Sequence, residues 1–93
     1  MAIRLIVTFR AQPGKGENFA EAFAPLIREA RKEKGCGQYD LFRSQDDPEH
    51  LVLLERWADQ ASLDAHSAAM QARGPSPTAP FRLGNPTMER YEC

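Results

Sequence analysis

Apolar and polar residues alternate along residues 3–11, the first segment of the chain. The apolar members of this alternation are Ile3, Leu5, Val7, Phe9 and Ala11. A period of two places them on one face, which predicts a β-strand with one strongly apolar side. Pro13, Gly14 and Gly16 follow and predict a turn, because proline lacks a backbone donor and glycine permits turn dihedrals.

A helical period replaces the alternation over residues 17–33. Its apolar positions recur at spacings of three and four: Phe19, Phe23, Leu26, Ile27 and Ala30. At 3.6 residues per turn they form one stripe, which predicts an amphipathic helix. Gly35 comes just after it and is expected to end the helix region in a left-handed conformation.

Two further strands are predicted, at residues 36–44 and 51–57, on either side of an Asp-Asp-Pro turn. Apolar residues occupy both sides of this hairpin. On one strand Tyr39 and Leu41 oppose Cys36 and Phe42, and on the other Leu51, Leu53 and Trp57 oppose Val52 and Leu54. A strand with one wet face would alternate cleanly between apolar and polar residues, so each face of this sheet needs a cover.

A second helix is predicted after Trp57. Asp59 is a suitable N-cap, and an apolar stripe follows at Leu63, His66, Ala69 and Met70. Residues 74–86 contain four prolines and two glycines, which predicts a loop or short turns. Thr87–Glu92 is expected to form the last strand.

The resulting element order, β-α-β-β-α-β, predicts an α+β domain of the ferredoxin-like type over residues 1–93, with an antiparallel sheet and both helices on one face. The helices leave the other sheet face uncovered. A chain of 93 residues buries only a modest core by itself. We therefore expect a homodimer through the sheet face, related by two-fold symmetry.

Charge and cysteine content argue against several kinds of partner and site. Twelve basic and thirteen acidic residues give a net charge of −1 without clusters, which argues against nucleic acid and against a membrane surface. Cys36 and Cys93 are far apart and fit no disulfide framework or metal-ligand spacing. The short apolar run at the N-terminus is interrupted by arginines, so we expect a cytoplasmic protein.

Trp57 and His66 are the candidate active-site pair, since both stand on apolar sides of neighbouring elements. An imidazole titrates near neutral pH and could take a phenolic proton as a general base, whereas the alternative is a core histidine. Trp57 could stack on a flat aromatic substrate or simply fill the core. Glu55 would share the strand face of Trp57, where an ion pair with Arg10 or Arg56 is favoured over a role as catalytic acid.

Other patterns have plainer interpretations. Phe9, Phe23 and Tyr39 could line a pocket, although aromatics at these periods usually form core. Residues 13–16 lack the phosphate-loop pattern and predict a turn. The acidic residues at 45–50 supply no closed ligand set, so no metal site is expected.

Three segments resemble the antibiotic biosynthesis monooxygenase (ABM) domain: PGKGENF, REARKEKGCGQYDLFRSQDDP and LVLLERWADQASLDAHSAAM. The resemblance runs from residue 3 to about residue 70. It implies a dimeric α+β barrel with a pocket between sheet and helices in each subunit. Trp57 matches the family's tryptophan at the end of the third strand, His66 its histidine in the second helix, and Glu55 the acidic residue of the ERW word.

The function that the resemblance implies is a quinol monooxygenase-like activity. Such an enzyme oxidises a hydroxylated aromatic, a quinol or polyketide-like phenol, with dioxygen and without a cofactor. Alternatives are a haem-degrading relative, an isomerase of a small phosphorylated sugar, and a non-catalytic small-molecule-binding dimer. Haem-degrading and some aromatic-oxidising members carry a catalytic asparagine in the first strand, but the only asparagines here are Asn18 and Asn85, which argues against haem.

Overall fold

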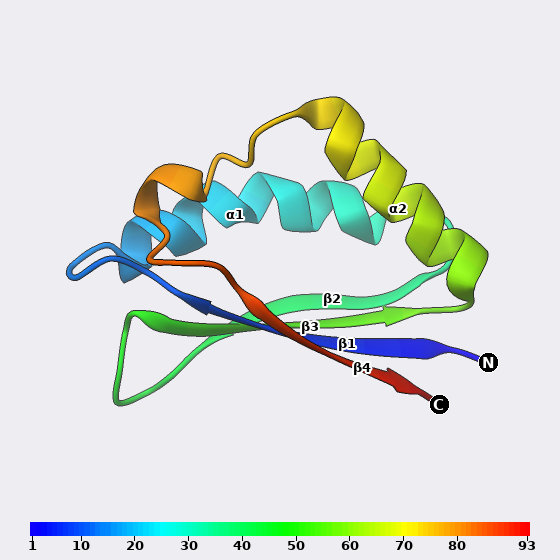
Figure 1. Ribbon diagram of the computed structural model, residues 1–93, viewed down its shortest axis with the longest axis horizontal. Helices are drawn as coiled ribbons and strands as arrows, with labels where there is room; N and C mark the ends of the chain where they lie inside the picture. The colour runs from blue at the N-terminus through cyan, green and yellow to red at the C-terminus, as the bar shows by residue number, and fades with distance from the viewer.

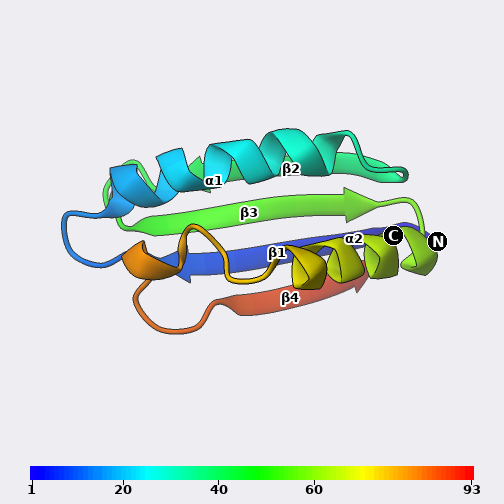
Figure 2. The same ribbon diagram turned by 90° about the horizontal axis from the view of Figure 1, so that it is seen from above.

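The computed structural model describes residues 1–93 and confirms the ferredoxin-like βαββαβ order (Figure 1). Its elements are β1 (Ile3–Arg10), α1 (Gly16–Arg31), β2 (Cys36–Arg43), β3 (His50–Trp57), α2 (Gln60–Arg73), the short 3-10 helix η1 (Ala79–Phe81) and β4 (Thr87–Glu92). The strands pair antiparallel in the order β2-β3-β1-β4. Both helices cover one face of the sheet, with α1 over β2 and α2 over β1 (Figure 2).

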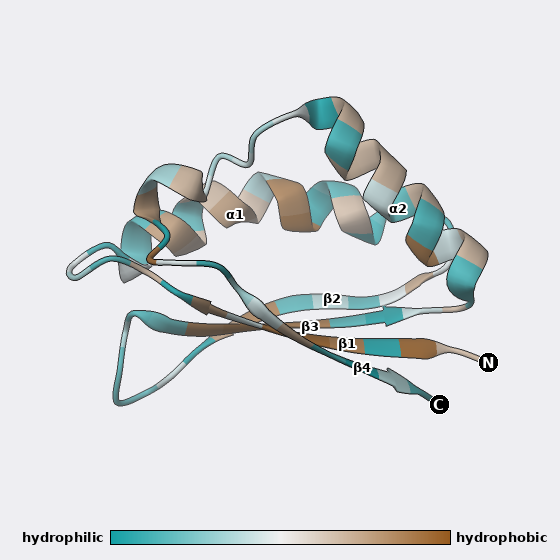
Figure 3. Ribbon diagram, in the orientation of Figure 1, coloured by the Kyte–Doolittle hydropathy of each residue, from teal (hydrophilic) through white to brown (hydrophobic).

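The core lies between this sheet face and the helices. The predicted apolar face of β1 is buried along its whole length, and it packs against Phe19 and Phe23 of α1 and Leu51 and Leu53 of β3. Figure 3 shows the apolar residues concentrated in the two central strands, β1 and β3, whereas β4 at the sheet edge is mostly polar. The central strands therefore supply most of the hydrophobic surface that holds the helices.

One face assignment in the hairpin is wrong. Cys36 was expected opposite Tyr39, but a β-bulge between Cys36 and Gln38 shifts the register. Cys36 consequently pairs with Trp57 and packs against the same core as Tyr39. A bulge inserts one residue into one strand, so strict alternation cannot reveal it.

The outer sheet face has no cover from the chain itself (Figure 1). Ile6, Val52 and Leu54 are only partly buried there, and Phe42 is 52% exposed. This placement agrees with the predicted second apolar set on the hairpin. A contiguous apolar face of this kind usually marks a contact surface.

The turn that joins α1 to β2 packs directly against α2. The α1 helix ends at Arg31, and Gly35 lies four residues later with φ +86°, the left-handed conformation expected for it. The Gly35 carbonyl accepts a hydrogen bond from Ala58 N–H at 2.8 Å. A Cβ at position 35 would lie 2.5 Å from Ser62 Cβ, so the close approach of this turn to α2 requires glycine.

We expect Gly35→Ala to lower the free energy of unfolding by about 2–4 kcal/mol, since it adds both backbone strain and steric overlap with Ser62. Gly14→Ala is the matched control, because Gly14 has φ +76° and open space around it. That control is expected to cost only about 1 kcal/mol. Urea unfolding measures both, and equal losses would contradict the packing argument.

Candidate active site

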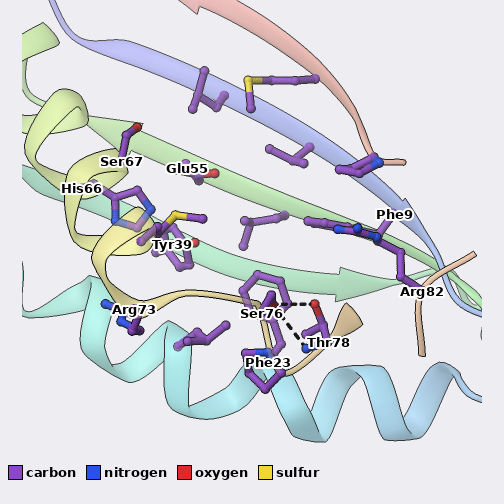
Figure 4. Close-up of a pocket in the computed structure, with 18 of the residues that line it drawn as sticks. Phe9, Phe23, Tyr39, Glu55, His66, Ser67, Arg73, Ser76, Thr78 and Arg82 are labelled. Atoms are coloured by element: carbon purple, nitrogen blue, oxygen red, sulfur yellow. Dashed lines mark hydrogen bonds between the residues drawn. The ribbon is translucent and has the colours of Figure 1, made fainter. Parts of the chain in front are cut away.

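A mostly apolar cavity of about 290 Å³ lies between the helices and the sheet. Its walls come from β1, β2 and β3 on one side and from α1 and α2 on the other, and residues 74–78 run along its edge (Figure 4). Ligand sites of proteins usually start near this size. The cavity therefore suits a compact molecule of one or two rings.

Five of the predicted site residues meet at this cavity: Phe9, Phe23, Tyr39, Glu55 and His66. They come from five different elements, and Figure 4 shows them converging on one space. Phe9 and Phe23 form part of an aromatic cluster, with ring centroids 5.7 Å apart. Residues separated by more than fifty positions in the chain thus share one pocket.

Trp57 is the exception, since it does not line the cavity. Its side chain is fully buried, and its ring lies 4.6 Å from the His66 ring, centroid to centroid. The expected stacking of Trp57 on a substrate therefore finds no support in its position. The strand ends where α2 begins, so His66 of the following helix covers the indole.

Trp57 instead holds two of the titratable groups of the pocket, Glu55 and His66. Its Nε1–H donates to Glu55 Oε1 at 2.9 Å, while its ring supports the His66 imidazole. The Tyr39 ring packs edge-on against both, at 6.3 Å from Trp57 and 5.4 Å from His66. A buried indole needs a hydrogen-bond acceptor, and here the carboxylate supplies it.

Glu55 is 5% exposed and has no cationic partner. The expected ion pair with Arg10 or Arg56 is wrong, because Arg10 pairs with Asp47 at 2.8 Å and Arg56 is exposed on the opposite sheet face. Burial raises the pKa of Glu55 above its ordinary value, and the smaller effects of Trp57 and His66 only partly oppose it. The carboxyl therefore keeps its proton to a higher pH than a solvated glutamate.

His66 is held by Glu33, a residue that sequence reasoning missed. His66 Nδ1 lies 2.8 Å from Glu33 Oε1, and Arg73 Nη2 lies 4.0 Å from the other carboxylate oxygen. An ionised carboxylate only accepts hydrogen bonds, so Nδ1 is the donor in this pair, and in the neutral imidazole Nε2 is then the acceptor. Glu33 stands in a run of charged residues that resembles a solvated helix end, which hides this role in the sequence.

Three further polar residues of the cavity, Ser76, Thr78 and Arg82, were also missed, because residues 74–86 offered only loop signals. Tyr39 adds a fourth polar group. Burial, followed by the nearby Glu55 carboxyl, raises the pKa of Tyr39, so its hydroxyl keeps its proton at neutral pH. The cavity thus combines apolar walls with a few hydrogen-bonding groups.

The remaining sequence candidates lie elsewhere. Burial raises the pKa of the Cys36 thiol, which disfavours the reactive thiolate. No group of three or more His, Cys, Asp or Glu side chains could hold a metal ion. Neither helix is long and apolar enough to cross a membrane.

Comparisons with known proteins identify the family and the fold of the chain. A family model described as "Antibiotic biosynthesis monooxygenase" matches residues 2–73. "Putative monooxygenase YcnE" of Bacillus subtilis (strain 168) is 32% identical over 65 residues, which cover 70% of this chain and 68% of that protein. "Putative monooxygenase Rv0793" of Mycobacterium tuberculosis is 34% identical over 64 residues, which cover 69% of this chain and 62% of that protein.

A solved structure shows how far the likeness extends along the chain. The crystal structure of a "putative antibiotic biosynthesis monooxygenase" from Caulobacter crescentus CB15 matches with a TM-score of 0.86 and 27% identity. That match covers 99% of this chain and 89% of the other. The similarity in structure thus includes residues 74–93, which the family model leaves out.

The buried carboxyl predicts a pH-dependent effect of Glu55→Gln. The folded state disfavours the ionised form of Glu55, so wild-type stability falls as pH rises from 4.5 through the raised pKa. Glutamine does not titrate and can still accept the Trp57 hydrogen bond. The variant should therefore gain stability relative to wild type over this range and then level off. Urea unfolding at several pH values measures the difference.

Glu21→Gln is the control, because Glu21 is exposed and makes no ion pair. Its stability difference from wild type should stay nearly constant with pH. A difference for Glu55→Gln that is equally constant would show that burial of the carboxyl does not control its titration.

Proposed function

Because the chain belongs to the antibiotic biosynthesis monooxygenase family, we propose that it is a cofactor-independent monooxygenase that oxidises a hydroxylated aromatic, a quinol or polyketide-like phenol, with dioxygen. The family match and the names of its relatives support a monooxygenase-type function. The substrate class rests on one observation: an imidazole and a buried carboxyl, whose pKa burial raises, face the same small apolar cavity.

His66 acts first, as the general base. Its free Nε2 takes the proton of a phenolic hydroxyl, and the Glu33 carboxylate stabilises the imidazolium that forms. Glu33 also keeps the ring in one orientation, so it is a positioning residue. The phenolate is a much better electron donor than the phenol, and in this proposal it is the only reductant.

Dioxygen then reacts with the phenolate directly. One electron passes to dioxygen, the resulting radicals combine, and a peroxide forms on a ring carbon. The O–O bond breaks as that carbon loses its proton, which leaves a carbonyl on the ring and releases the second oxygen as water. For a quinol the sum is quinol plus dioxygen to hydroxyquinone plus water, with four electrons from the substrate.

Glu55 supplies the proton that this O–O cleavage needs. Burial raises the pKa of Glu55, which favours the protonated carboxyl that can donate to the departing peroxide oxygen. The proton lost by the substrate later restores the acid. The apolar walls exclude bulk water and hold the ring in one pose, which favours the reaction over release of reduced oxygen. Trp57 contributes by positioning Glu55 and His66.

The same proposal includes a homodimer through the outer sheet face. Ile6, Val52, Leu54 and Phe42 form an apolar surface that no element of the chain covers. Two copies related by a two-fold axis would bury this surface against itself. Its burial would also brace β1 and β3, the strands that carry the cavity floor.

His66→Ala is expected to lower dioxygen uptake with 1,4-dihydroxynaphthalene roughly a hundredfold or more, because the general base is lost. An oxygen electrode measures the rate above the uncatalysed oxidation. The matched control is His50→Ala, since His50 is the other histidine of the chain and does not line the cavity. Equal rates for His66→Ala and wild type would remove His66 from the mechanism, and no uptake by wild type across several quinols would overturn the proposed function.

Phe42→Asp is expected to convert the dimer to a monomer in analytical ultracentrifugation at micromolar concentration. The aspartate would place a charge in the apolar contact. Leu83→Asp is the control, because Leu83 is 51% exposed, almost as much as Phe42 at 52%, but lies outside the sheet face. A monomeric wild-type protein would contradict the proposed dimer.

A further inference from the structure

Arg82 is a cation in the cavity that the proposed chemistry does not use. It is partly buried, it lines the cavity, and Figure 4 shows its side chain pointing inward beside Phe9. No acidic side chain lies within ion-pair distance of it. The other arginine of the cavity, Arg73, differs because the Glu33 carboxylate is 4.0 Å away. Arg82 therefore contributes an uncompensated positive charge.

The backbone holds Arg82 firmly in this position. Arg82 forms an isolated β-bridge with Ala11, and the next residue, Leu83, donates its N–H to Arg10 O at 2.7 Å. Gln12 Nε2 donates to Arg82 O at 3.3 Å. The end of β1 thus fixes the Arg82 backbone before any ligand binds, which lowers the entropy cost of forming a contact there.

A hydroxyl pair adds a second donor on this side of the cavity. Ser76 Oγ and Thr78 Oγ1 are 2.8 Å apart, both residues line the cavity, and Thr78 is only 2% exposed. One hydroxyl proton is used in the bond between them. Two hydroxyls carry two protons, so one proton is left to donate to a ligand. The backbone N–H of Thr78 also donates to Ser76 Oγ. This bond uses a lone pair of the Ser76 oxygen and does not use either hydroxyl proton.

We propose that Arg82 and the Ser76–Thr78 pair bind an acidic group of the substrate, so that the substrate is a hydroxylated aromatic carboxylic acid. A partly buried guanidinium without a counter-ion is unfavourable, and a carboxylate compensates it with two parallel hydrogen bonds. The Glu55 carboxyl does not compete with the substrate for Arg82, because it lies with His66 at the other end of the cavity (Figure 4).

This inference deepens the proposed function and rests on it for the oxidation step, but not for binding. With the carboxylate at Arg82, the ring would lie between Phe9 and Tyr39 along the apolar walls. Its far hydroxyl would then face the imidazole and the carboxyl. The acid group would thereby set which hydroxyl loses its proton.

Binding of two matched probes without dioxygen tests the inference. The probes are 1,4-dihydroxy-2-naphthoate and 1,4-dihydroxynaphthalene, which differ only by the carboxylate, and calorimetry measures their dissociation constants. We expect wild type to bind the naphthoate about tenfold or more tightly than the neutral diol. Arg82→Gln should remove this preference while it changes the affinity for the diol less than about twofold.

Arg28→Gln is the control, because Arg28 is exposed on α1 and does not line the cavity, and its loss changes the net charge equally. It should leave both dissociation constants unchanged. Equal binding of the two probes by wild type, or the same loss in both arginine variants, would overturn the inference. Dioxygen uptake is then measured separately. Tighter binding of the naphthoate without dioxygen uptake would support the acid-binding site and reject the oxygenase function. Dioxygen uptake without tighter binding of the naphthoate would support the oxygenase function and reject the acid-binding site.

Discussion

The structure depends on one buried interaction, the hydrogen bond from the Trp57 indole to the Glu55 carboxyl beneath the His66 ring. A carboxyl in an apolar interior is unfavourable unless it is hydrogen-bonded or neutral. The indole donates the one hydrogen bond that Glu55 accepts from the chain, and burial favours the protonated form. The placement of the imidazole and the carboxyl in the pocket follows from how this strand end packs under α2.

The same packing explains why a small domain can hold a cavity at all. The α1 helix lies over β2 and α2 lies over β1, so the two helices lie on either side of β3 (Figure 2). Aromatic rings line part of the space, and the segment after α2 runs along the remaining edge. Two helices can cover only one face of the sheet. The same two-layer arrangement therefore leaves the apolar outer face of the sheet uncovered.

Periodicity predicted the element order, the amphipathic α1 and the buried face of β1, because these depend on which residues repeat at 2.0 or 3.6 positions. It also predicted that five candidate site residues lie on one side of the sheet, and all five line the cavity: Phe9, Phe23, Tyr39, Glu55 and His66. It failed at Cys36, where a bulge changes the side that the residue faces. It also assigned Glu55 an arginine partner, although the hydrogen-bond partner in the structure is the Trp57 indole.

The sequence by itself determined the fold class, the apolar face of each main element and the family to which the chain belongs. Only the tertiary structure decided the partners: Glu33 for His66, Trp57 for Glu55, and none for Arg82. The physical reason is distance along the chain. Hydrophobic periods are local and repeat many times, whereas a hydrogen bond between residues 33 positions apart leaves no pattern in the sequence.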